Sequence, residues 1–237
     1  MDVSRAVYFW LGLVAFWSVV LTIIFRAEKR MVWPFGELQP VLPPKCDPTG
    51  YGSRWVNDAS QAGWKMLGWS RDIKFIKYNI YYALMISPDQ STCAVIGTGQ
   101  MGPMVLKATW LYTPTADGRT LYTTDNQTGV TIDLSGNWRN QLVFAPNFGA
   151  LYLQHQAWLH SVNAMPRKFT AGREMSDLRA VRDEHFNAME RAGLIFFTDP
   201  AHQYFNFTLL GAAKSAPWGY LVGLSRALSR GRFPRVA

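Results

Sequence analysis

The pattern of apolar and polar positions begins with one long apolar segment. From Ala6 to Phe25 the sequence AVYFWLGLVAFWSVVLTIIF contains no charged residue over twenty positions. A helix of this length extends about 30 Å, which matches the hydrocarbon core of a bilayer. The apolar region of a cleaved signal peptide has only about 7–15 residues and ends at a small-residue cleavage site, which this segment lacks. We therefore expect residues 1–30 to form a retained transmembrane anchor with its flanks.

Basic residues on the two sides of this segment predict its orientation. Arg5 precedes the segment, whereas Arg26, Lys29 and Arg30 follow it. Because lysines and arginines that flank a span favour the cytoplasmic side, the N-terminus is expected outside. This favours a single-pass protein of the cell (inner) membrane, with its globular part in the cytoplasm rather than the periplasm.

One face of the expected anchor helix carries mostly small or hydroxyl-bearing residues. At spacings of 4, 3, 3 and 4, the residues on this face are Tyr8, Gly12, Ala15, Ser18 and Thr22. Small residues let two helix backbones approach closely, so this face is a candidate for packing on another transmembrane helix. The alternative is that small residues fall there by chance. Trp10 and Trp33, near the two ends, suit an aromatic belt at the membrane interfaces.

A proline-rich connector and a helix are expected next. Residues 31–48 contain five prolines, which remove hydrogen-bond donors and favour an extended backbone. A short helix is predicted from about Asn57 to Leu67, with Asp58 near its start and Gly68 as its stop signal.

Strand-like segments then alternate with turn signals. The segments are Tyr78–Ser87, Thr92–Ile96, Val105–Thr113, Arg119–Thr124 and Val130–Leu134. Turns are indicated at Pro88-Asp89 and at Asp117-Gly118, the second of which is typical of a tight hairpin. This block predicts an antiparallel meander of about five strands.

The remaining sequence is mostly helical in pattern. Helices are predicted at Phe148–Val162, Ser176–Ala192 and Ala216–Ser229, with two strands at Leu194–Thr198 and Tyr204–Leu209. Together with the strand block this predicts one α+β domain over residues 49–237, ending in a basic helix and tail.

The distribution of charge along the chain indicates which kinds of partner the protein binds. The net charge of +8 divides into +2 for residues 1–30, +5 for residues 212–237 and only +1 between them, which argues against a nucleic-acid-binding body. Basic residues near a membrane attract acidic headgroups. The predicted contacts with the membrane interface or a partner are Trp10, Arg26, Lys29, Arg30, Trp33, Trp218, Arg226, Arg230, Arg232 and Arg235.

The two cysteines, Cys46 and Cys93, do not have the spacing of a zinc site. In an oxidising compartment they could form a disulfide, and in the cytoplasm they would be ordinary thiols.

A glycine-rich segment raises the hypothesis of nucleotide binding. Residues 94–102, AVIGTGQMG, resemble the dinucleotide-binding turn of Rossmann proteins. That turn requires a following helix and an acidic residue at the end of the next strand, but a strand-like segment follows and Asp117 lies in the hairpin turn. A glycine-rich strand connection explains the segment better.

Two histidines raise the hypothesis of a metal or haem site. His155 and His185 fall on the apolar stripes of two predicted helices, so their rings would approach if those helices packed together. A histidine on an apolar stripe is more often a hydrogen-bonded core residue, and no accompanying ligand motif occurs. We therefore predict neither a metal ion nor a cofactor, and no catalytic residue.

These features favour a non-catalytic accessory or scaffold subunit of a larger integral-membrane complex. Its expected partners are the bilayer and other transmembrane helices. The host could be an energy-transducing complex, photosynthetic or respiratory, because the layout is similar to that of the H subunit of purple-bacterial reaction centres, although no sequence motif is shared. The alternatives are a membrane-tethered binding domain for a lipid, peptide or envelope component, and a membrane-anchored enzyme.

Overall fold

The protein is described by a computed structural model that forms two compact units. The structure describes residues 3–27, 29–43, 45–73, 78–102, 104–125 and 138–214. One unit combines Met1–Val32 with Phe186–Ala237, and the other is Trp33–His185.

The first unit contains the N-terminal helix and a small sheet. Helix α1 spans Val3–Ala27, which confirms the helix expected over residues 6–25. Within the part of the chain that the structure describes, no helical segment reaches the length and apolar character needed to cross a bilayer. An antiparallel sheet is built from β1 (Arg30–Met31), β10 (Tyr204–Phe207) and β9 (Ile195–Phe197), in that spatial order.

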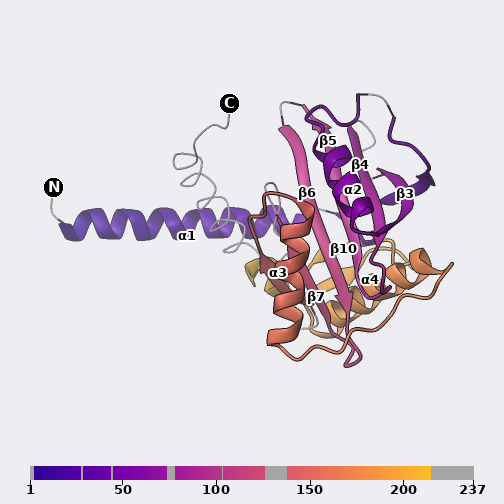
Figure 1. Cartoon of the computed structure of the whole chain (residues 1–237). Helices are drawn as coiled ribbons and strands as arrows, with labels where there is room; N and C mark the ends of the chain where they lie inside the picture. The colour runs from indigo at the N-terminus through magenta and orange to yellow at the C-terminus, as the bar shows by residue number, and fades with distance from the viewer. Residues whose placement is uncertain are drawn as a thin grey trace. The chain divides into compact units, whose positions relative to one another are not determined.

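The second unit is built on a seven-stranded sheet whose strands neighbour one another in chain order (Figure 1). The strands are β2 (Phe35–Gln39), β3 (Lys65–Asp72), β4 (Asn79–Ile86), β5 (Cys93–Met101), β6 (Met104–Pro114), β7 (Thr120–Thr124) and β8 (Trp138–Leu142). All neighbours are antiparallel except β7 and β8, which are parallel. The predicted meander is therefore the centre of a larger, mixed sheet. The strand predicted at Val130–Leu134 lies outside the described residues.

Both faces of this sheet are covered by helices. Side chains of β4 alternate between the faces, so that Ala83 and Met85 join a core with α2 (Tyr51–Gln61) and α3 (Phe148–Ser161). Leu84 and Ile86 join a second core with α4 (Glu174–Arg191) on the opposite face. Because β4 is buried on both sides, its sequence is apolar from Ile80 to Ile86 and does not alternate with polar residues.

The first helix of this unit differs from the prediction. Helix α2 covers Tyr51–Gln61 rather than Asn57–Leu67, because the Asp47 carboxylate accepts hydrogen bonds from the backbone N–H groups of Gly52 and Ser53 at its start. Gly68, expected to end the helix, lies in β3 at a register shift and has a φ of 149°. The glycine that suggested a helix end therefore supplies the positive φ of a β-bulge.

The remaining predicted elements agree more closely with the structure. Helices α3 and α4 lie within two residues of their predicted bounds at each end, and β9 and β10 occupy the two predicted strands. The predicted connector, residues 31–48, contains β2, which pairs with β3 at the edge of the large sheet. The helix predicted at Ala216–Ser229 lies beyond the described part of the chain.

The glycine-rich segment, residues 94–102, lies mainly within β5 and forms no nucleotide-binding turn. Gly97 faces the rings of Trp110 and Tyr82, and a Cβ there would lie 2.9 Å from the Trp110 ring. Gly99 has a φ of 146°, and a Cβ there would lie 2.1 Å from the carbonyl oxygen of Asn79 on β4. These glycines are therefore needed for close approach between neighbouring strands and side chains.

We expect Gly99→Ala to lower the free energy of unfolding by roughly 2–5 kcal/mol, because overpacking and backbone strain each cost about 1–3 kcal/mol. Chemical denaturation of the purified full chain measures the effect. Gly118→Ala is the matched control, because Gly118 also has a positive φ of 79° but a Cβ there meets nothing within 4 Å. A loss for Gly99→Ala no larger than for the control would contradict this packing argument.

Candidate functional site

Helix α1 presents exposed large apolar side chains on several of its sides. The exposed ones among the described residues are Tyr8, Phe16, Trp17, Val19, Ile23 and Ile24. Successive residues turn by about 100°, so Val19 and Trp17 project from opposite sides of the helix. A helix that is apolar on all sides needs apolar surroundings, in a core or in a membrane. The exposed surface of α1 is the first part of the candidate functional site.

The predicted helix-packing face is found on this surface in part. Tyr8, Gly12 and Ala15 are exposed, and a Cβ added to Gly12 would meet nothing within 4 Å. Ser18 and Thr22 are half-buried, and the Thr22 hydroxyl donates a hydrogen bond to the Ser18 carbonyl oxygen at 2.7 Å. Since this bond is made within the helix, the Thr22 hydroxyl contributes less to an interhelical contact than the sequence suggested.

The C-terminal end of α1 is joined to the small sheet by polar and aromatic contacts. The Asn206 side-chain amide donates a hydrogen bond to the Arg26 carbonyl oxygen at 3.1 Å. The Lys29 ammonium lies 4.2 Å from the centre of the Tyr204 ring, which is within cation–π range. These contacts connect residues about 180 positions apart. This junction between α1 and β10 is the second part of the candidate site.

The other predicted interface residues do not lie together: some are at the junction, one is in the second unit, and the rest are outside the described residues. Arg26 and Lys29 are exposed at the junction, and the Arg30 guanidinium lies 5.0 Å from the centre of the Phe207 ring. Trp33 belongs to the second unit, where its ring lies 4.9 Å from that of Phe35. The Trp10 side chain lies outside the described residues, as do Trp218, Arg226, Arg230, Arg232 and Arg235.

A buried carboxyl group lies between α2 and the large sheet. Asp125, which is 1% exposed, accepts hydrogen bonds from the Tyr51 hydroxyl and from the backbone N–H of Thr109. Burial raises the pKa of Asp125 to about 6, although these hydrogen bonds favour the ionised form. Burial and the neighbouring Asp125 charge raise the pKa of Tyr51 far above its usual value, so Tyr51 acts as a hydrogen-bond donor here.

His155 connects two threonines on the face of the sheet that α2 and α3 cover. Its Nε2 lies 2.8 Å from the Thr113 hydroxyl and its Nδ1 lies 2.7 Å from the Thr123 hydroxyl. Thr123 donates to Gln141, so it can accept from Nδ1–H, while Thr113 donates to Nε2. Burial lowers the pKa of His155 to about 4, so the ring is neutral at pH 7. These bonds support the interpretation of a core histidine.

The sheet separates the residues that suggested metal, haem or disulfide chemistry. His155 lies on α3 and His185 on α4, and these helices cover opposite faces. No cluster of histidine, cysteine, aspartate or glutamate that could hold a metal ion occurs among the described residues. Cys46 and Cys93 are buried and belong to the two different cores, so this arrangement does not join them in a disulfide.

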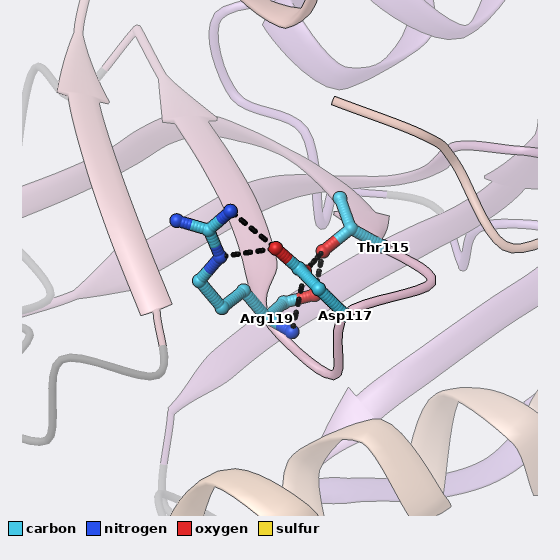
Figure 2. Close-up of polar contacts among 3 residues, drawn as sticks. All are labelled: Thr115, Asp117 and Arg119. Atoms are coloured by element: carbon cyan, nitrogen blue, oxygen red, sulfur yellow. Dashed lines mark hydrogen bonds and ion pairs between the residues drawn. The ribbon is translucent and has the colours of Figure 1, made fainter. Parts of the chain in front are cut away.

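Asp117, the first acidic residue after the glycine-rich segment, forms its contacts within its own hairpin turn. Figure 2 shows the Asp117 carboxylate with the Arg119 guanidinium and the Thr115 hydroxyl. The hydrogen bond from Arg119, followed by that from Thr115, holds the pKa of Asp117 well below its usual range. Gly118 in the same turn has a φ of 79°, which confirms the predicted turn. Asp117 thus stabilises the β6–β7 turn.

The second unit also contains two open cavities. One, of about 440 Å³, lies between the segment Pro40–Pro43 and α2 and is lined in part by Lys45, Val56 and Trp69. The other, of about 320 Å³, is lined by residues of α2 together with Lys107, Ala145 and Pro146. Neither was foreseen, because each combines segments that are distant in the sequence.

Comparison of the chain with known protein families, curated proteins and solved structures yields no match.

The buried Asp125 predicts a pH dependence of stability. Because its pKa is higher in the folded than in the unfolded protein, protonation favours the folded state, and this contribution grows as pH falls from about 6 towards 4. Asp125→Asn should remove this pH-dependent contribution. The difference in free energy of unfolding between wild type and variant should therefore change by roughly 2 kcal/mol between pH 7 and pH 4. Denaturant unfolding of both proteins across this range measures the change. A difference independent of pH would contradict the raised pKa.

Proposed function

We propose that the protein is a single-pass, membrane-anchored accessory subunit without catalytic activity, which stabilises a larger integral-membrane complex. In this proposal α1 is the anchor and also contacts the transmembrane helices of a partner. The globular part, on the cytoplasmic side of the cell (inner) membrane, contacts the partner's membrane-proximal surface. Photosynthetic or respiratory complexes are the hosts that the layout favours.

The observation that carries this proposal is the apolar surface of α1. The uncharged sequence from Ala6 to Phe25 has the length of a bilayer's hydrocarbon core, and exposed apolar side chains project from several sides of the helix. Such a surface is unstable in water and matches a lipid environment. Arg26, Lys29 and Arg30 follow it closely, and by the positive-inside rule they favour a cytoplasmic globular part.

We favour a scaffold over an enzyme because the residues that could take part in catalysis have structural roles. Asp125, His155 and Asp117 each make hydrogen bonds that stabilise a strand, a core or a turn. The glycine-rich segment is mainly a strand, and the two stripe histidines are separated by the sheet. These residues support structural roles, whereas the exposed surface of α1 supports a role in binding.

Gly12 offers a direct test of the partner helix. We expect Gly12→Leu to reduce the amount of co-purifying membrane protein in mild detergent, because a bulky side chain prevents close approach of a second helix. The substitution should leave the isolated chain folded, since a Cβ at Gly12 meets nothing within 4 Å. Quantitative mass spectrometry of the purified complex measures the loss.

Val20→Leu is the matched control, because Val20 lies outside the predicted packing face. It adds bulk to the same helix and should leave co-purification unchanged. Equal losses for both variants, or recovery of the wild-type chain with no other membrane protein, would contradict the accessory-subunit proposal.

A second candidate function is a membrane-tethered binding domain, which the cavity of about 440 Å³ favours. The cavity is lined by apolar groups of Val41, Leu42 and Trp69 together with the charged Lys45 and Asp47, a combination suited to an amphiphile with a polar head.

For this second function we expect a lysophospholipid to raise the unfolding temperature of the full chain, and Val41→Glu to reduce the shift by placing a charge in the apolar lining. Leu153→Glu is the control, because Leu153 on α3 is 71% exposed and Val41 is 72% exposed. Equal shifts for both variants would exclude the cavity as the binding site.

A further inference from the structure

The small sheet of the first unit has two faces of different character. Phe205 and Phe207 of β10 point to one face, together with the buried Ile195 of β9. This face is covered by Phe186 of α4, whose ring lies 4.9 Å from that of Phe205. Because side chains alternate along a strand, Tyr204 and Asn206 point to the other face. We call this second face, with Phe196, Thr198, Tyr204 and Asn206, the junction face.

The junction face lies at the C-terminal end of α1. Asn206 on this face donates its hydrogen bond to the Arg26 carbonyl oxygen, in the last turn of the helix. Phe196 is the partner of Asn206 in the β9–β10 register, so the two side chains stand side by side. The position of Phe196 relative to the end of α1 is therefore fixed within this unit.

The chemistry of the junction face matches a membrane interface. Phe196 is 46% exposed although it is aromatic and lies in a sheet. The Lys29 ammonium stacks on Tyr204, and the side chain of Arg26 is exposed beside them. The described acidic group nearby, Asp199, accepts hydrogen bonds from the backbone N–H groups of Gln203 and Tyr204 and interacts electrostatically with Lys29. Its negative charge offsets part of the positive charge of Lys29 and Arg26. Glu28 lies outside the described residues.

We infer that the junction face rests on the headgroup layer of an acidic bilayer, with Phe196 inserted at the depth where α1 leaves the hydrocarbon. This inference rests on the proposed anchoring of α1. If the apolar helix crosses the bilayer, Arg26 lies at the headgroup level, and the Asn206 bond places Phe196 at the same level. Aromatic rings beside basic groups are the combination that this layer favours, because acidic headgroups attract the cations.

Site-selective fluorescence on the full chain tests the inference. Both native cysteines are buried, so a cysteine introduced on the surface can be labelled selectively with bimane. The positions to compare are Phe196→Cys and Thr198→Cys on the junction face, Val19→Cys within α1, and Glu190→Cys on α4. Glu190 is the control because α4 covers the opposite face of the same small sheet. Each labelled chain is placed in nanodiscs containing lipids with a spin label near the headgroup or deep in the acyl chain.

In nanodiscs with acidic lipid, labels at positions 196 and 198 should lose emission to the headgroup quencher, and their emission should shift to the blue. The label at position 19 should be quenched by the deep spin label, and the label at 190 by neither. Lys29→Gln should weaken the quenching at 196, because it removes a cation that attracts acidic headgroups.

The possible failures are distinguishable. If positions 196 and 198 behave like 190 while position 19 is quenched, the inference is wrong but the anchor remains. If position 19 is not quenched either, the proposed membrane anchoring is wrong as well. Equal quenching at 196 in purely zwitterionic nanodiscs would overturn the part of the inference that assigns acidic headgroups. The Thr198→Cys variant keeps the Phe196 ring, so it shows whether the result at position 196 is only a local effect of replacing that ring.

Discussion

Every central strand of the seven-stranded sheet has to supply side chains to two hydrophobic cores, and the architecture of the larger unit depends on this. The strand β4 illustrates it, since Ala83 and Met85 pack under α2 and α3 while Leu84 and Ile86 pack under α4. Close packing on and within this sheet also explains two glycines: a side chain at Gly97 would collide with the Trp110 ring, and one at Gly99 with the backbone of β4. Burial also requires that polar groups inside the cores be hydrogen-bonded, as Asp125 and His155 are.

The burial of both faces of the sheet also explains the role of the polar residues in this unit. A buried carboxyl group with a raised pKa is often a sign of catalysis, but structural networks perturb pKa values in the same way. Asp125 is held by Tyr51 and Thr109 at the point where β7 ends, and His155 links Thr113 of β6 to Thr123 of β7. These bonds connect helices and strands to one another. They therefore support a rigid scaffold more directly than a reactive centre.

The smaller unit is organised by a different interaction, between α1 and a strand from far along the chain. The bond from Asn206 to Arg26, and the stacking of Lys29 on Tyr204, hold the end of the apolar helix against β10. Under the proposed function, this arrangement links the depth of the helix in a bilayer to the position of the small sheet. The exposed apolar surface of α1 and the junction face would then form one continuous membrane-facing surface.

The sequence by itself determined the elements whose signals are local. The uncharged segment predicted a helix, and strand-forming residues between turn signals predicted most strands. Periodic apolar positions predicted α3 and α4, and Asp117-Gly118 predicted a hairpin. Local signals failed where a residue acts through distant partners. Gly68 resembles a helix stop but serves a bulge between strands. Asp47, rather than Asp58, accepts hydrogen bonds from the first turn of α2, and it also accepts one from Thr98 on β5. Only the tertiary structure decided that His155 and His185, and likewise Cys46 and Cys93, belong to opposite faces of one sheet, and that Asn206 meets Arg26. The physical reason is that periodicity reports which side of its own element a residue occupies, whereas the identity of the facing surface depends on how distant elements pack.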